Sequence, residues 1–236
     1  MVRLNGNKKK KTNPLVVTNV TSRQSFFNEI AETWDKRFQT WELTNFLKRL
    51  LPTFGLMEGQ KIMDAGTGTG ILIPFLLHAV GPTGHITAID YADKMIEVCR
   101  SKYGNRSNVS LAVQKVEQIN YSSESFDVVT CFGLFPHLEN RQEALRQMNR
   151  VLKRGGRLII AHALSSTEIK AHHHNASAVV AKDALPSRSK MRRLLKQAGF
   201  YRIRIIDKPG CYLCLSDKLS VGAISTIGLS EGGKGS

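Results

Sequence analysis

The chain has 236 residues, of which 42% are hydrophobic and 22% are charged, and its formal net charge is +15 at pH 7. This composition is typical of a globular protein and excludes a disordered or collagen-like chain. The longest strongly apolar run, residues 71–80, is about half of the ~20 residues that a membrane-spanning helix needs, so we predict no membrane span.

The amphipathic and alternating patterns predict helices and strands that follow one another along the chain. Two helices come first, at residues 23–34 and 41–53, and then strands and helices alternate. The predicted strands cover residues 61–64, 85–90, 109–113, 126–131, 157–162, 201–206 and 210–215, and the later helices cover residues 70–80, 93–103, 139–152 and 187–198. This order predicts an α/β fold with a doubly wound, mostly parallel sheet, whose last two strands form an antiparallel pair because no helix separates them.

Much of the positive charge lies near the two ends of the chain. Residues 1–22 carry Arg3 and Lys8 to Lys11 without an acid, and residues 182–218 carry ten Lys or Arg against three Asp. Such charge fits a nucleic-acid partner, or a basic surface that only meets solvent. We predict a flexible tail at residues 1–22, a domain at 23–218 and a second flexible tail at 219–236.

The number of cysteines and the residues at the N-terminus predict the cellular compartment of the protein. Four cysteines in 236 residues do not form a disulfide framework, and Cys211 and Cys214 make one isolated pair in a predicted strand. The basic start is not followed by the apolar segment of a secretory signal. We therefore expect a cytoplasmic protein.

A glycine-rich turn follows the first predicted strand and opens a helix. It reads Asp64-Ala-Gly-Thr-Gly-Thr-Gly70, with three alternating glycines and an acid two residues before the first of them. Glycines let the backbone approach a ligand closely, and a doubly wound sheet binds ligands at this end of its strands. A carboxylate here does not suit a pyrophosphate, but it suits a ligand that bears an ammonium group.

The second predicted strand ends in an acid, Asp90, followed by Tyr91. An acid at this place can accept hydrogen bonds from both hydroxyl groups of a ribose. Tyr91 could pack against an adenine ring. The two motifs together predict a nucleoside ligand with an amino-acid end, which is the chemistry of S-adenosylmethionine.

In order, four segments resemble the motifs of class I S-adenosylmethionine-dependent methyltransferases. These segments are Lys61 to Gly70, Ile89-Asp90, Ser125 to Val129 and Arg150 to Leu158. Residues 26–34 resemble the opening helix of the subgroup that includes the ubiquinone and menaquinone biosynthesis methyltransferases. The resemblance covers residues ~25–215 and implies a Rossmann-like seven-stranded sheet in which the last strand is inserted antiparallel.

The resemblance also implies a cofactor site. The residues carried over to it are Asp64, Gly66, Thr67, Gly68, Gly70, Asp90, Tyr91, Met95, Val116 and Cys131. One position departs from the family, since Lys115 stands where an acid often takes the adenine amino group. Lysine cannot accept a hydrogen bond, so adenine would depend on the backbone at Val116, or on Gln114 or Glu117.

Several histidines follow the fourth and fifth predicted strands, on the rim that carries the glycine turn. His137 and His162 come directly after these strands, and His173 lies in a later insertion. We weigh three roles: histidines that shape the pocket, a general base at His137 or His173, and a metal site from His137, His162 and one histidine of residues 172–174 with Asp183. Residues 164–186 are the expected substrate cap. Phe27 and Trp34 are either core residues or a lid, and with His162 and Asp183 they complete the predicted acceptor side.

The leading functional prediction is transfer of a methyl group to a small-molecule acceptor by in-line displacement, with S-adenosylhomocysteine as product. An RNA methyltransferase is the first alternative, favoured by the basic helix at 187–198 and the lysine-rich tail. A non-catalytic protein that binds S-adenosylmethionine on the same fold is the second. The predicted core leaves little room for a separate domain that binds a nucleic-acid substrate, so nucleic acid is the less favoured acceptor. The sequence does not specify the oligomeric state.

Overall fold

A seven-stranded sheet forms the centre of the protein, for which a computed structural model describes residues 22–220. The predicted tails at 1–22 and 219–236 lie almost wholly outside the described residues. The strand order is β3-β2-β1-β4-β5-β7-β6. The strands are β1 (Lys61–Ala65), β2 (His85–Asp90), β3 (Val109–Val113), β4 (Phe126–Phe132), β5 (Leu152–His162), β6 (Phe200–Lys208) and β7 (Cys211–Lys218).

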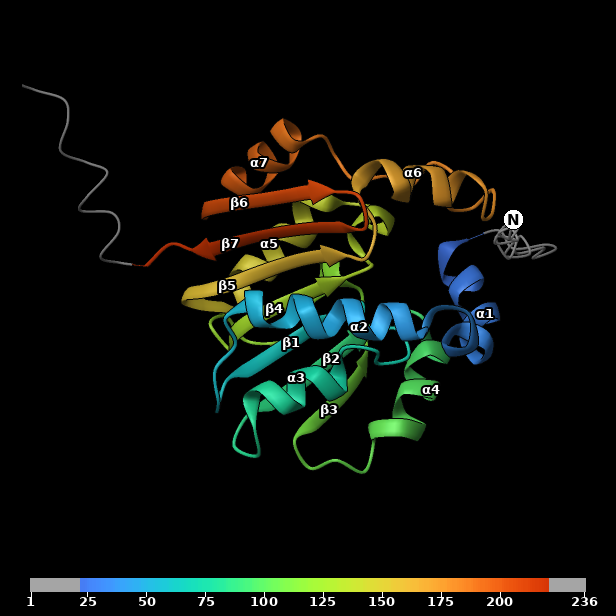
Figure 1. Ribbon diagram of the computed structural model, residues 1–236. Coiled ribbons are helices and arrows are strands. Elements are labelled where there is room, and N and C mark those ends of the chain that lie inside the picture. The colour runs from blue at the N-terminus through green and yellow to red at the C-terminus, as the bar shows by residue number, and fades with distance from the viewer. Residues whose placement is uncertain (1–21, 221–236) are drawn as a thin grey trace, which may run out of the picture.

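The predicted topology is confirmed. Strands β1 to β5 pair in parallel, and β7 lies between β5 and β6, antiparallel to both. The arrowheads in Figure 1 show that the parallel strands all end on the side where α1 and α6 lie. The carboxyl ends of these strands are therefore the edge at which the predicted motifs gather.

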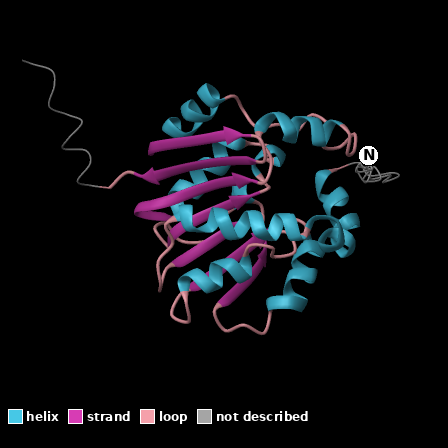
Figure 2. Ribbon diagram, viewed as in Figure 1, coloured by secondary structure: helices cyan, strands magenta, loops and turns pink. Residues whose placement is uncertain are grey.

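Helices cover both faces of the sheet (Figure 2). They are α1 (Arg23–Phe38), α2 (Trp41–Leu50), α3 (Ile73–Val80), α4 (Asp93–Tyr103), α5 (Arg141–Val151), α6 (Ser166–His174) and α7 (Arg188–Gln197), with short 3-10 turns η1 (Leu51–Phe54), η2 (Val116–Gln118) and η3 (Phe135–His137). Alternating side chains of each strand serve the two faces: Ile62 packs with α2 and α3, whereas Met63 packs with α5 and α7. Within residues 22–220, no helix is long and apolar enough to cross a membrane.

Some predicted boundaries differ from the observed ones. The glycine turn continues further than expected, so α3 begins at Ile73 and not at residue 70. Strand β5 already begins at Leu152, because Phe126 of β4 pairs with Leu152 before the register shifts at a bulge. Helix α6 was not predicted, although Ser165 and Glu168 form a capping box at its start.

Candidate active site

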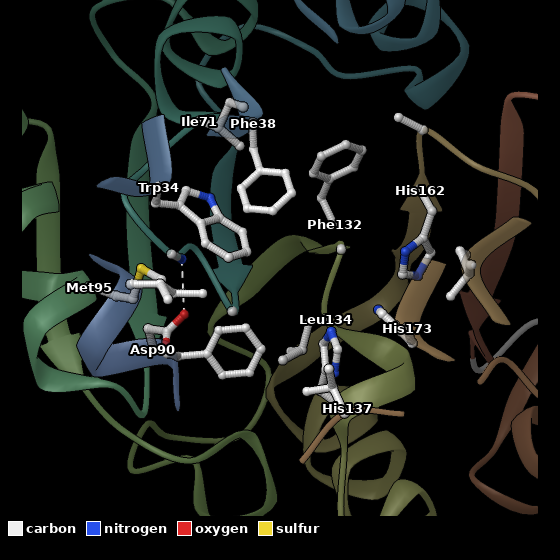
Figure 3. Close-up of a pocket in the computed structure, with 18 of the residues that line it drawn as sticks. Trp34, Phe38, Ile71, Asp90, Met95, Phe132, Leu134, His137, His162 and His173 are labelled. Atoms are coloured by element: carbon white, nitrogen blue, oxygen red, sulfur yellow. Dashed lines mark hydrogen bonds between the residues drawn. The ribbon is translucent and has the colours of Figure 1, made fainter. Parts of the chain in front are cut away.

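A cavity of about 240 Å³ lies at the carboxyl ends of the parallel strands. Most of its wall is apolar and comes from α1, the segments after β1 and β4, and the segment that contains α6. In Figure 3, Trp34 and Phe38 lie on one side of this cavity, and His162 and His173 lie on the other. The apolar wall includes Phe26, Phe27, Ile30, Trp34, Phe38, Leu43, Ile71, Met95, Phe132, Leu134, Leu164, Ile169 and Val180.

The glycine turn presents its backbone to this cavity, as the sequence predicted. Gly66, Thr67 and Gly68 line the wall, and both glycines have positive φ angles, 72° and 55°. The turn is held by strand β2, because Gly66 N and Thr67 N donate hydrogen bonds to Ile89 O at 2.8 and 3.0 Å. A Cβ atom added at Gly68 would meet no atom within 4 Å. The backbone is thus open to a ligand at this residue.

Asp90 lies beside this turn, at the end of β2. Its carboxylate accepts hydrogen bonds from Gly68 N and Ala92 N, both at 2.9 Å, and the dashed line in Figure 3 marks the first of them. The residue is only 8% exposed, and burial raises its pKa to about 6, although the backbone hydrogen bonds act in the opposite direction. Each carboxylate oxygen keeps a second lone pair, so Asp90 can still accept hydrogen bonds from two hydroxyl groups of a ligand.

Three residues predicted at the cofactor do not line the cavity. Asp64 points to the neighbouring strand, where Thr130 Oγ1 donates to its Oδ1 at 2.7 Å, because these residues are paired in register between β1 and β4. The side chain is buried and does not line the cavity, and burial raises its pKa. Cys131 is fully buried in the core, and Gly70 packs against α4.

The contrast between Gly68 and Gly70 gives a first prediction. We expect Gly68→Ala to weaken S-adenosylmethionine binding at least about 10-fold, because the added methyl group would stand in the space that the ligand needs. The cost in stability is about 1 kcal/mol, for a side chain in the left-handed region. Titration calorimetry measures the affinity, and thermal unfolding measures the stability.

Gly70→Ala is the matched variant. A Cβ at this position would lie 2.8 Å from both Cys99 Sγ and Tyr103 Cε2, at a φ of +87°. We expect this variant to lose more stability than Gly68→Ala, about 2 kcal/mol or more, because the methyl group overpacks the core against α4. A Gly68→Ala protein that binds as tightly as wild type would contradict the placement of the ligand.

The other residues predicted at the cofactor lie around the same space. Tyr91 and Met95 line the main cavity, and a smaller one of about 30 Å³ adjoins it. Gly66, Asp90, Tyr91 and Leu134 border both cavities, and Val116 closes the smaller one together with Gln114 and Glu117. Lys115 is exposed, and its Nζ lies 4.0 Å from Glu139 Oε2. The predicted adenine region is thus a pocket beside Asp90.

His137 is held at the cavity by a buried carboxylate. Its Nδ1 lies 2.8 Å from Oδ2 of Asp183, whose side chain is only 3% exposed. Asp183 also accepts two hydrogen bonds from the guanidinium of Arg23, which the sequence analysis did not single out. Burial raises the pKa of Asp183, but the bonds from Arg23 and His137 outweigh it and lower the pKa to about 2. Because this carboxylate stays ionised, it can only accept, so Nδ1 of His137 carries the proton.

The predicted acceptor-side residues are only partly brought together. His173 lies with its ring centre 4.7 Å from that of His137, and both line the cavity together with His162, Phe27 and Trp34. Asp183 does not line this cavity, but its carboxylate contacts His137, which does. Much of the apolar wall was not predicted from the sequence, above all Phe38, Phe132 and Leu134. Their local sequence pattern does not distinguish residues that line a cavity from residues that fill the core.

Two of these histidines are held neutral. Burial lowers the pKa of His173 to about 4 and that of His162 to about 3. Nδ1 of His173 lies 2.7 Å from the carbonyl oxygen of Asp183, an acceptor, so this nitrogen carries the proton and leaves Nε2 as an acceptor. Among the described residues, no three His, Cys, Asp or Glu side chains are arranged to hold a metal ion. The structure thus gives no support to the metal site considered for His137, His162 and His173.

The neutral state of His162 predicts a pH-dependent stability. Its folded pKa of about 3 lies below the ordinary value of 6.5, so its contribution is complete above pH 6.5 and is lost as the pH falls from there towards 3. We expect His162→Phe to reduce the slope of unfolding free energy against pH by about 1 kcal/mol per pH unit between pH 6 and 4. Denaturant unfolding at several pH values measures this slope.

The exposed Trp41 provides the control, since Trp41→Phe changes no titratable group and should leave the slope unchanged. Asp90 titrates in the opposite sense, because its raised pKa makes the protein more stable as the pH falls from about 6 towards 4. It is present in both proteins, so its effect cancels in the comparison. Equal slopes for wild type and His162→Phe would refute the buried neutral imidazole.

Comparisons with known proteins agree with this geometry. Residues 63–160 match a family model described as a methyltransferase domain. A demethylmenaquinone methyltransferase of Staphylococcus aureus is 39% identical over 113 residues, which are 48% of this chain and 46% of that protein. The chain thus matches about half the length of the curated relatives.

Solved structures extend the likeness to most of the described fold. A SAM-dependent methyltransferase from Aquifex aeolicus is 21% identical, with a TM-score of 0.64 over 84% of this chain and 100% of that one. Phosphoethanolamine N-methyltransferase 2 of Haemonchus contortus, solved with S-adenosylhomocysteine, has a TM-score of 0.68 at 15% identity, over 84% of this chain and 59% of that one. The match of residues 63–160 and the curated relative thus agree with the predicted resemblance to S-adenosylmethionine-dependent methyltransferases, and the solved structures confirm the predicted fold.

Proposed function

We propose that this chain, whose residues 63–160 carry the methyltransferase domain, transfers a methyl group from S-adenosylmethionine to a small aromatic acceptor, with His137 as the general base. One observation carries the proposal: an imidazole oriented by a buried carboxylate opens on an apolar cavity, beside the glycine turn and Asp90. The proposed domain remains residues 23–218, with residues 164–186 as the substrate cap.

The described residues fit the cofactor. The open backbone at Gly68 and the free lone pairs of Asp90 suit the amino-acid end and the ribose, and the pocket beside Val116 suits the adenine. Bound there, S-adenosylmethionine supplies a methyl group on a sulfonium centre, which a nucleophile can displace. The apolar wall from α1 and α6 excludes water from this space, so that the acceptor rather than water meets the methyl group.

His137 is the better base of the two predicted. Asp183 fixes its ring with the proton on Nδ1, which leaves the lone pair of Nε2 free to take a proton from the acceptor. His173 has the same tautomer, but burial lowers its pKa to about 4, so that it holds a proton poorly at neutral pH. We therefore propose that His137 accepts the proton and that His173 only lines the pocket.

The cavity wall indicates the class of acceptor. Phe27 meets the ring of His137 edge-on at 5.1 Å, and Trp34 and Phe38 stack at 4.3 Å on the same helix. Apart from Asp90, the wall offers no Asp, Glu, Lys or Arg among the described residues. An uncharged aromatic ring with an acidic hydroxyl group, such as a phenol or a hydroquinone, suits this wall and a histidine base. The likeness to a demethylmenaquinone methyltransferase supports this class.

A turnover screen tests the proposal. Methyl-labelled S-adenosylmethionine is offered with reduced demethylmenaquinone, simple phenols, phosphoethanolamine and total RNA, and the labelled product is identified. We expect label in the hydroquinone or the phenols. Label only in RNA would overturn the proposal in favour of the alternative that the basic helix α7 suggests, and binding without any turnover would favour a non-catalytic protein. We also propose that the protein acts in the cytoplasm.

A further inference from the structure

Three segments that are distant in sequence meet at the carboxylate of Asp183. Arg23 is the first residue of α1 and donates from Nε to Oδ2 at 2.9 Å and from Nη2 to Oδ1 at 2.5 Å. His137, from η3, donates to Oδ2 at 2.8 Å. Asp183 itself belongs to the segment between α6 and α7, and its side chain is 3% exposed.

We propose that Arg23 is a positioning residue for the base: docking of α1 supplies the guanidinium that orients Asp183, and Asp183 in turn orients His137. This inference rests on the proposed function, because it gives His137 the role of base. Arg23 itself lies away from the cavity wall, so it acts through the two other residues and not on the acceptor.

The fork geometry of arginine gives this arrangement its effect. Two parallel N–H donors bind the two carboxylate oxygens and so fix the plane of the carboxylate. With the plane fixed, the lone pair of Oδ2 that remains points to Nδ1 of His137 and holds the ring in one tautomer. A carboxylate this deeply buried would also be costly without a cationic partner. Without Arg23, Asp183 can rotate or bind a proton, and both changes release the imidazole.

Helix α1 connects the base with the cofactor side of the cavity. Nε2 of Gln24 donates to Tyr91 O at 2.8 Å, and the Asn28 side chain bonds to Asp93 Oδ1 at 2.6 Å. Near its other end, Asp35 accepts hydrogen bonds from Thr69 Oγ1 and Lys102 Nζ. Phe27 from the same helix packs against His137. A helix seated on the cofactor loops therefore brings both Arg23 and Phe27 to the base.

Steady-state kinetics of Arg23 variants give the first test. With the acceptor found in the screen, we expect Arg23→Gln to lower kcat about 10-fold, part of the ~10²–10⁴ that a general base contributes, with KM for S-adenosylmethionine within two-fold of wild type. Arg23→Lys keeps the charge but loses the fork, and should recover part of the loss. Arg37→Gln removes an exposed charge in the last turn of the same helix and should match wild type.

A double variant separates positioning from a general loss of structure. If Arg23 acts through Asp183, then Arg23→Gln combined with Asp183→Asn should be no slower than Asp183→Asn alone. Additive losses of kcat in the double variant would overturn the inference. An Arg23→Gln protein with the kcat of wild type would do the same.

The tautomer of His137 provides a readout that needs no methyl transfer. Nitrogen-15 NMR of the imidazole should show the proton on Nδ1 in wild type and in Arg37→Gln, and a mixture of tautomers in Arg23→Gln. The same tautomer in all three proteins would overturn the inference, whatever the acceptor is. If the tautomer changes as expected but His137→Ala retains full turnover, the proposed base is wrong and the positioning by Arg23 stands.

Discussion

Asp90→Asn is expected to bind S-adenosylmethionine about 100-fold more weakly than wild type. A carboxylate that accepts hydrogen bonds from two ribose hydroxyl groups contributes about 1.5–3 kcal/mol for each charge-assisted bond. Gly68 N and Ala92 N donate to different oxygens of Asp90, so the amide keeps an acceptor for only one of them, places an NH2 donor against the other, and removes the charge. Titration calorimetry at pH 7.5 measures the affinity directly.

The pH dependence of the same binding adds a second readout. Because burial raises the pKa of Asp90 to about 6, the carboxylate is ionised above this value and takes up a proton as the pH falls through it. Affinity of the wild type should therefore fall between pH 7 and 5, and that of Asp90→Asn should change less. All other side chains are the same in the two proteins, so the difference between the two curves reports Asp90.

Glu97→Gln is the control for this position. Glu97 is an exposed acid on α4 that pairs with Lys94 and lines neither cavity beside Asp90. It should bind S-adenosylmethionine within about two-fold of wild type, and circular dichroism should show that both variants fold. An Asp90→Asn protein with unchanged affinity would place the ribose elsewhere.

His137→Ala has the second large expected effect, a loss of kcat of about 10²–10⁴-fold. The variant removes the only imidazole that is oriented by the Asp183 carboxylate among the described residues, while the glycine turn and Asp90 stay in place. The affinity for S-adenosylmethionine should change less than about three-fold. Initial rates with the acceptor from the screen, together with calorimetry on the same preparations, measure both quantities.

Two other histidines make the comparison specific. His173→Ala should cost kcat less than about 10-fold, because the low pKa of this imidazole leaves it a poor base. His174→Ala, at an exposed position outside the cavity wall, should match wild type. Equal losses for His137→Ala and His173→Ala would point to shared shaping of the pocket, and an unchanged rate for His137→Ala would refute the proposed base.

Local sequence patterns gave the fold and the cofactor half of the site. The glycines after β1 and the acid at the end of β2 are short-range features, and a parallel sheet brings strand ends to one edge whatever else the chain does. The sequence did not predict the partner of Asp64. The register between β1 and β4 places its carboxylate beside the hydroxyl group of Thr130.

The acceptor half of the site depended on contacts between distant parts of the chain. The sequence placed His137, His173 and Asp183 on one rim of the sheet and left the roles of base, metal ligand and pocket lining open. Asp183 lies 46 residues from His137 and 160 from Arg23, and no local period encodes such contacts. Ser165 and Glu168 form a capping box, a local sequence pattern that indicates the start of helix α6. The sequence prediction for residues 164–186 was a substrate cap without this helix.

The sequence by itself therefore predicted the α/β class, the mostly parallel sheet and the glycine-rich motif, because these follow from hydrophobic periodicity and from glycines and acids at fixed local spacing. The place of the last strand was implied only by the resemblance to the methyltransferase family. Only the tertiary structure decided which histidine contacts the buried carboxylate of Asp183, that a helix from the start of the described residues contributes Arg23, and that Asp64, Gly70 and Cys131 face the interior. The physical reason is that a side chain's partner, and with it its burial, charge and tautomer, is set by packing between segments that lie far apart in the chain.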